Sequence, residues 1–138
     1  MIRIENLWKR FEDHEVLRGV NLEIRDGETL TIIGGSGCGK SVLLKHMVGL
    51  LQPDEGAIEV DGVGIVGLPE GPLAAVQKNF GMLFQGAALF DSLSVGENVA
   101  FGLRHLRHLS EETVRAKVAE RLGMVGLEGI EALKPSEL

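Results

Sequence analysis

Residues 34–41 read GGSGCGKS and directly follow the apolar run TLTII of residues 29–33. They match the pattern G-x-x-x-x-G-K-[S/T], in which glycines let successive backbone N–H groups face a phosphate chain that a Cβ would keep away. A helix that begins at such a loop adds the positive end of its dipole. The stretch therefore predicts a cradle for a nucleoside triphosphate, with a strand at 29–33 before it and a helix from Lys40 to Leu51 after it.

The loop supplies most of the candidate binding residues. They are Gly34, Gly35, Ser36, Gly37, Cys38, Gly39, Lys40 and Ser41. The amides of residues 35–39 are expected to line the phosphates, the Lys40 ammonium to reach the β and γ phosphates, and the Ser41 hydroxyl to ligate Mg²⁺. Cys38 is either a reactive thiol, favoured by Lys40 and the helix start, or a small residue that points away from the phosphate. A nucleophilic role would need a histidine base, which the local sequence does not provide.

Composition limits the class of protein to which this loop can belong. The chain has 138 residues, of which 44% are hydrophobic, with a net charge of -6 and one cysteine. Its length suits one globular domain, and its acidic balance argues against a general nucleic-acid binder. A single cysteine cannot form an intramolecular disulfide, which indicates a reducing compartment. The sequence shows no signal segment and no apolar run of the ~18 residues that cross a bilayer.

Apolar periodicity predicts the remaining elements. Alternating strands are expected at residues 2–6, 16–24 and 56–62, with the third joining the sheet of the first two. A second buried strand, FGMLF, is predicted at residues 80–84, after a short helical piece that follows Pro69 and Pro72. Together with residues 29–33 it would give two strands of a parallel core sheet.

Two helices are predicted in the C-terminal third. The first begins with a capping box of Ser94 and Glu97, and the second begins at Ser110. Their expected core faces are Val95, Val99, Leu103 and Leu106 in the first helix and Val114, Val118, Leu122 and Val125 in the second. His105 and His108 are spaced to share a metal ion, but a basic face with Arg104 and Arg107 is the alternative that the lack of a third ligand favours.

The segment from Gly34 to Gly62 resembles the ATP-binding subunits of ABC transporters. The residues that carry the resemblance after the loop are Gly49, Leu50, Pro53, Gly56, Ile58 and Gly62. The resemblance implies an α/β fold, the N-terminal part of a P-loop NTPase of the ABC ATPase type, with an antiparallel β segment and the start of a helical subdomain. It also implies that Gln85, after the strand at 80–84, is the Q-loop glutamine that helps to hold Mg²⁺ and the attacking water. Phe11 occupies the place of the A-loop aromatic that stacks on the adenine of ATP, with ordinary packing as the alternative.

The run from Gly81 to Arg104, together with SVLLKH after the loop and KPSEL at residues 134–138, is similar to the ATPase subunits of Mla/Mce-type lipid transporters, the MlaF-like group. That similarity implies a homodimer of ATP-binding subunits beneath a transmembrane permease, with MCE-domain and STAS-domain proteins as further partners and no nucleic acid. It implies a cytoplasmic location, peripheral to the membrane through the permease, and transport of lipid or phospholipid.

In the resembled family, KPSEL continues into an LSGGQ-type signature, a Walker B aspartate with a catalytic glutamate, and a switch histidine. None of these lies within residues 1–138, which are therefore expected to form a partial nucleotide-binding domain. The chain alone is expected not to hydrolyse ATP, although the full-length family member would.

Three other functions are compatible with parts of this sequence. A soluble ABC ATPase of DNA repair or translation would share the loop and the glutamine, but the acidic balance disfavours it. A P-loop kinase or GTPase would lack the β-rich start and the context of Gln85. A nucleotide-binding module without hydrolysis fits residues 1–138 as they stand.

Overall fold

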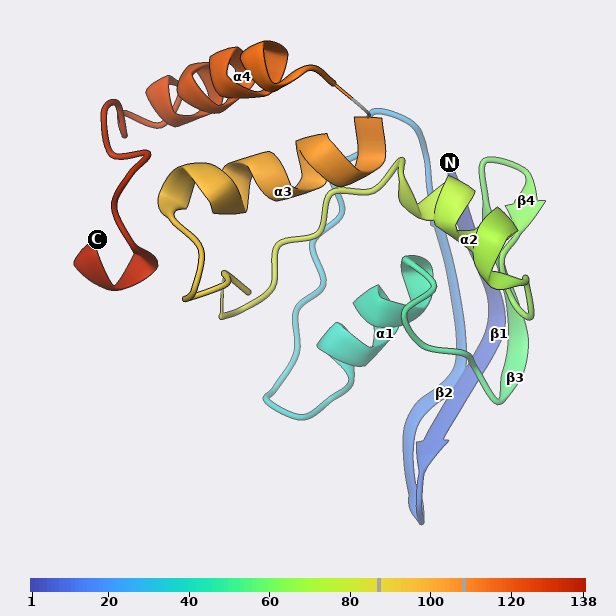
Figure 1. The fold of residues 1–138 in the computed structure, drawn as a ribbon. Coiled ribbons are helices and arrows are strands. Elements are labelled where there is room, and N and C mark those ends of the chain that lie inside the picture. The colour runs from blue at the N-terminus through green and yellow to red at the C-terminus, as the bar shows by residue number, and fades with distance from the viewer. Residues whose placement is uncertain (87, 108) are drawn as a thin grey trace. The chain divides into compact units, whose positions relative to one another are not determined.

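The computed structural model describes residues 1–86, 88–107 and 109–138, without the side chains of residues 105–107. The chain forms two compact units, Met1–Gly81 and Met82–Leu138. The first contains an antiparallel sheet and two short helices, and the second contains two longer helices (Figure 1).

The sheet of the first unit has four strands in the order β2-β1-β3-β4. Each strand pairs antiparallel with its neighbour, and Ile4 of the central strand lies opposite Leu22 on one side and Ile58 on the other. The strands are β1 (Ile2–Phe11), β2 (His14–Ile24), β3 (Glu55–Val60) and β4 (Val63–Gly64). The predicted strands at 2–6, 16–24 and 56–62 are thus confirmed, including the place of the third in the first sheet.

A β-bulge at Asn6 changes which face of β1 is buried. Ile4 and Leu7 are both fully buried although they are three residues apart, and the pairing register shifts between them. Asn6 has a φ of 48°, and its amide donates to the side chain of Asn21 at 2.9 Å. The bulge therefore lets both apolar side chains reach one core while its displaced amide keeps a partner.

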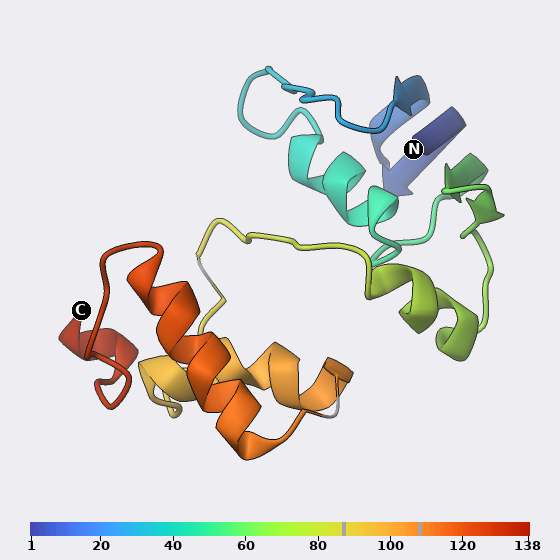
Figure 2. The ribbon, with the colours of Figure 1, turned by 90° about the horizontal axis from the view of Figure 1, so that it is seen from above.

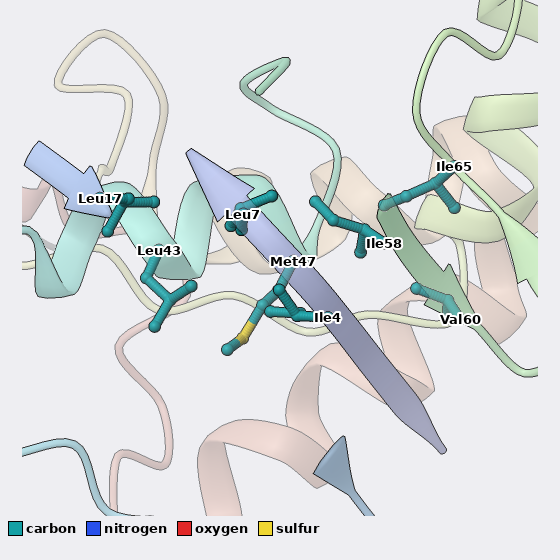
Figure 3. Packing of buried hydrophobic residues seen from close by; sticks show 8 residues of the cluster. All are labelled: Ile4, Leu7, Leu17, Leu43, Met47, Ile58, Val60 and Ile65. Atoms are coloured by element: carbon teal, nitrogen blue, oxygen red, sulfur yellow. The ribbon is translucent and has the colours of Figure 1, made fainter. Parts of the chain in front are cut away.

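Helix α1 (Lys40–Met47) covers one face of the sheet (Figure 1). Leu43 and Met47, one turn apart, pack into a cluster with apolar side chains of the strands (Figure 3). Its buried members are Ile4, Leu7, Leu17, Leu43, Met47, Ile58, Val60 and Ile65. The helix ends earlier than Leu51, because Gly49 takes a φ of 69° and the Leu50 amide turns back to the Lys45 carbonyl at 2.8 Å.

The predicted short helix is confirmed as α2 (Glu70–Gln77), with Pro69 at its N-cap. Its last side chain, the Gln77 amide, donates to the Val48 carbonyl at 3.0 Å and so ties α2 to the end of α1.

The strands predicted at residues 29–33 and 80–84 are wrong for the described part of the chain, and so is the parallel core sheet. Both segments lack ladder hydrogen bonds and lie outside the sheet. Ile33 is 90% exposed and Leu83 is 87% exposed. A strand exists only through a paired neighbour, and among the described residues neither apolar run has one.

Helices α3 (Val95–Arg107) and α4 (Glu111–Gly123) form the core of the second unit and pack side by side (Figure 2). The buried side chains are Val95, Ala100, Val114, Val118 and Leu122, with Val99 and Leu103 packed against them. The predicted faces are thus confirmed apart from two residues. Val125 is 68% exposed, because α4 ends at Gly123, and the side chain of Leu106 lies outside the described residues.

The starts of both helices are capped as the sequence predicts. The Glu97 amide donates to the Ser94 hydroxyl at 3.1 Å and the Ser94 amide donates to the Glu97 carboxylate at 2.6 Å, which completes the capping box. Ser110 accepts from the Thr113 amide at the start of α4.

The segment after α4 returns to the start of α3. The amides of Val95 and Gly96 donate to the carbonyls of Leu133 and Glu131 at 2.8 and 2.9 Å, and a Cβ on Gly96 would lie 3.0 Å from the Glu131 oxygen. The segment ends in the 3₁₀ turn η1 (Pro135–Glu137). The first amides of α3, which its own helix cannot satisfy, therefore find partners in the segment that follows α4.

We expect Gly56→Ala to destabilise the first unit strongly. Gly56 lies opposite the bulge with a φ of 98°, and a Cβ there would be 2.4 Å from the Asn6 carbonyl oxygen. The clash with backbone should lower the free energy of unfolding by about 3 kcal/mol in urea denaturation. Gly62→Ala is the matched control, because Gly62 also has a positive φ, of 81°, but open space around it. It should cost only about 1 kcal/mol, and equal losses in the two variants would contradict the role of the close approach.

The capping box of α3 predicts a pH dependence. The hydrogen bond from the Ser94 amide holds the pKa of Glu97 below its ordinary value of 4.5. A carboxyl group whose pKa is lowered on folding stabilises the folded state at pH values above its ordinary pKa. This stabilisation is lost as the pH falls through the folded-state pKa. The melting temperature of Glu97→Gln should therefore fall less between pH 6 and pH 3 than that of the wild type. Glu112→Gln, which removes a first-turn carboxylate with no hydrogen bond in the described structure, should follow the wild type.

Candidate functional site

The glycine loop of the first unit owes its path to two residues with positive φ. Gly37 has a φ of 78° and Gly39, the N-cap of α1, has a φ of 95°. A Cβ on Gly39 would lie 2.9 Å from a methyl group of Val16 and 3.2 Å from the Val16 carbonyl oxygen. The loop therefore rests directly on β2, and only glycine allows it to come so close.

The start of α1 is favourable to an anion. It has no acidic residue in its first turn and no side-chain cap, and the first intrahelical bond of its ladder runs from the Leu43 amide to the Gly39 carbonyl at 2.8 Å. The preceding amides of the first turn have no carbonyl of their own helix to bind. These amides and the positive end of the helix dipole therefore face the glycine loop, which lies directly before α1.

Lys40 folds over this loop. Its ammonium donates to the carbonyls of Gly34 at 2.8 Å and Gly35 at 2.6 Å, and lies 3.6 Å from the Cys38 sulfur. The charge is thereby held on the inner side of the loop by neutral acceptors, without an ion pair in the described structure. An oxyanion placed here would compete with these carbonyls for the ammonium, and its full negative charge would add an attraction that a neutral carbonyl lacks.

Ser41 and Cys38 flank Lys40, and both are exposed. Ser41 lies in the first turn of α1, so its hydroxyl is available to a cation held on the phosphates. No histidine in the described residues bonds Cys38, so nothing there supports the nucleophile interpretation.

Phe11 ends β1 next to the β1–β2 turn and is 43% exposed. The Lys9 ammonium lies over its ring, 5.5 Å from the centroid. Phe11 is thus partly accessible, in the same unit as the loop. No sequence pattern singles out Lys9, which is recognisable only by its position two residues before Phe11.

Gln85 belongs to the second unit, where it is exposed and lies in a turn. The glycine loop and Phe11 belong to the first unit, so the structure places these two together but not Gln85. The Q-loop role of Gln85 stays a prediction. His108 and the side chain of His105 lie outside the described residues, as does the metal interpretation built on them. Elsewhere in the described chain, no group of three side chains is placed to hold a metal ion.

His46 is a buried polar residue that the sequence analysis did not single out. It lies on α1, fully buried, with its Nδ1 2.7 Å from the Val42 carbonyl and its Nε2 without a partner in the described structure. A carbonyl can only accept, so Nδ1 carries the hydrogen of this bond.

Comparison with known proteins decides the family. Residues 17–138 match the family described as "ABC transporter". The chain belongs to the ABC transporter family. Over the part that the structure describes, no helix is long and apolar enough to cross a membrane.

Relatives and solved structures agree with this assignment. The chain is 46% identical over 130 residues to the spermidine/putrescine import ATP-binding protein PotA of Methylococcus capsulatus, covering 94% of this chain and 32% of the relative. It is 42% identical over 138 residues to the intermembrane phospholipid transport system ATP-binding protein MlaF of Haemophilus influenzae, covering 100% of this chain and 52% of the relative. The chain therefore spans between about a third and about half of these relatives' length.

The dimeric ATP-binding cassette MJ0796, bound to ADP and phosphate in a post-hydrolysis state, superposes with a TM-score of 0.89 at 30% identity, over 100% of this chain and 63% of that one. The predicted fold class, the N-terminal part of an α/β P-loop NTPase with an antiparallel sheet and helices, is confirmed. Membership of the ABC family is likewise confirmed, while the MlaF-like group is one of several to which relatives belong.

Proposed function

We propose that residues 1–138 are the N-terminal part of the ATP-binding subunit of an ABC transporter, and that they bind ATP with Mg²⁺ at the glycine loop. One observation carries the proposal. The Lys40 ammonium, the acid-free start of α1 and the backbone of Gly39 meet at one loop, where all three favour a phosphate chain. The adenine would stack on Phe11, and the loop amides of Gly35 to Gly39 would hold the phosphates.

The residues present suit Mg²⁺ as part of such a site. The exposed Ser41 hydroxyl in the acid-free first turn is an oxygen ligand, and Mg²⁺ commonly takes one or two protein ligands together with phosphate oxygens. Ser41 would hold the ion, which neutralises phosphate charge when bound. The roles proposed for Gln85, as a further ligand of the ion and in orienting the attacking water, rest on the resemblance to ABC ATP-binding subunits alone.

The complete subunit would hydrolyse ATP as a homodimer bound to a transmembrane permease, peripheral to the cytoplasmic face of the membrane. We propose phospholipid or another lipid as the cargo, with MCE-domain and STAS-domain partners. The support is the likeness of the run from Gly81 to Arg104 to Mla/Mce-type subunits and the match of this chain to 52% of MlaF. A polyamine is the alternative cargo, since PotA is named for spermidine and putrescine import.

We expect Lys40→Ala to weaken binding of ATP by about tenfold or more and to leave binding of adenosine nearly unchanged. Only the triphosphate uses the ammonium, and a hydrogen bond to a charged group contributes about 1.5–3 kcal/mol. Isothermal titration calorimetry with both ligands measures the difference. Lys45→Ala is the control, because Lys45 is an exposed lysine near the end of α1 and its loss changes the net charge equally. Equal weakening of both ligands in Lys40→Ala would show that Lys40 acts through folding and would contradict the proposed site.

The 138-residue chain should bind ATP without turning it over. It contains no LSGGQ-type signature, Walker B aspartate or catalytic glutamate, and each such preorganised group contributes about 2–4 kcal/mol to the transition state. Phosphate release with Mg²⁺ and ATP should equal that of Lys40→Ala, measured as background. Turnover clearly above this background would mean that a carboxylate within these residues serves in catalysis.

A further inference from the structure

Lys9 links the exposed aromatic ring at the end of β1 to the segment that follows α1. Its ammonium lies over the Phe11 ring at 5.5 Å, donates to the Asp54 carboxylate at 2.9 Å and donates to the Gln52 carbonyl at 2.9 Å. The Lys9 side chain is only 16% exposed. A lysine with this much of its surface covered is held in one place, and its charge is screened less than that of a solvated lysine.

Two backbone hydrogen bonds tighten the same junction. The Arg10 amide donates to the second oxygen of Asp54 at 2.7 Å, and the Asp54 amide donates to the Trp8 carbonyl at 2.9 Å. The hydrogen bond from Lys9, followed by that from the Arg10 amide, holds the pKa of Asp54 below its ordinary range. Asp54 is therefore ionised at neutral pH and holds the Lys9 ammonium in position.

We propose that Lys9 is a positioning residue for the nucleotide base: it occupies one face of the Phe11 ring and leaves the opposite face for adenine. The inference rests on the proposed function, in which Phe11 stacks on the base. An aromatic face is electron-rich, so a cation on one side attracts the ring and draws electron density from the opposite face. The ring is then fixed in orientation and better suited to stack on an electron-rich purine.

Lys9 also connects Phe11 to the segment that joins α1 to β3. The cradle lies at the start of α1, and Asp54 lies directly before β3, which pairs with β1. A ligand that contacts both the cradle and Phe11 would depend on the position of the ring, whereas a ligand that contacts only the cradle would not.

The test compares two ligands of the full 138-residue chain, Mg²⁺–ATP and Mg²⁺–tripolyphosphate, by isothermal titration calorimetry. Tripolyphosphate has the phosphate chain but no base. Lys9→Met should weaken ATP binding about threefold, the size of an exposed to partly buried cation–π contact, and leave tripolyphosphate binding unchanged. Lys9→Arg keeps the cation and should restore ATP binding.

A double-mutant cycle separates positioning from a general structural role. In a Phe11→Leu background, Lys9→Met should no longer affect ATP binding, because the ring through which it acts is gone. Asp54→Asn, which weakens the hold on the ammonium without changing Lys9 or Phe11, should give the same selective loss of ATP binding and serves if Lys9→Met does not fold.

Equal weakening of both ligands, or an undiminished effect of Lys9→Met in the Phe11→Leu background, would overturn the inference while leaving the proposed function intact. Unchanged ATP binding in Lys9→Met would do the same. A wild-type chain that binds neither ligand would overturn the proposed function together with the inference.

Discussion

The close approach of Gly39 to the backbone of Val16 is the contact on which the candidate site depends. A Cβ at Gly39 would lie 3.2 Å from the Val16 carbonyl oxygen and 2.9 Å from a Val16 methyl group, and the φ of Gly39 is 95°, so glycine suits this position. Because Gly39 is also the N-cap of α1, the same contact determines where the helix begins. Leu43 and Met47 then complete the core from the helix side. The shape of the proposed phosphate cradle therefore follows from how one helix packs on one sheet.

Local patterns predicted most of the fold because they are properties of neighbouring residues. The three strands with alternating residues, the capping box at Ser94 and the N-cap at Ser110 all formed as expected. The apolar runs at 29–33 and 80–84 did not form strands, since pairing requires a neighbour that the run itself does not specify. The bulge at Asn6 was missed for a similar reason, because its amide is satisfied by Asn21, fifteen residues away.

The candidate site likewise has one part that local sequence predicts and one part that depends on long-range contacts. Its cradle occupies eight consecutive residues, whose spacing alone predicts the chemistry, and the structure adds the folding of the Lys40 ammonium onto the carbonyls of Gly34 and Gly35. The junction of Lys9 with Asp54 joins residues 45 positions apart, and neither residue has a local pattern that points to the other. Phe11 has no local signal beyond being a single aromatic residue at a strand end, and its contact with Lys9 is created by the folding of the chain.

Charge raises a further constraint, because a chain with a net charge of -6 is proposed to bind a polyanion. Beyond about 8 Å at physiological ionic strength, exposed carboxylates are largely screened, so the charges close to the ligand decide. Within that range α1 contributes a first turn without acid, unpaired amides and the Lys40 ammonium. Asp54 forms an ion pair with Lys9, whose ammonium also lies over the Phe11 ring. Phosphate binding at the proposed cradle would therefore depend on oriented backbone dipoles and one lysine, rather than on the net charge of the chain.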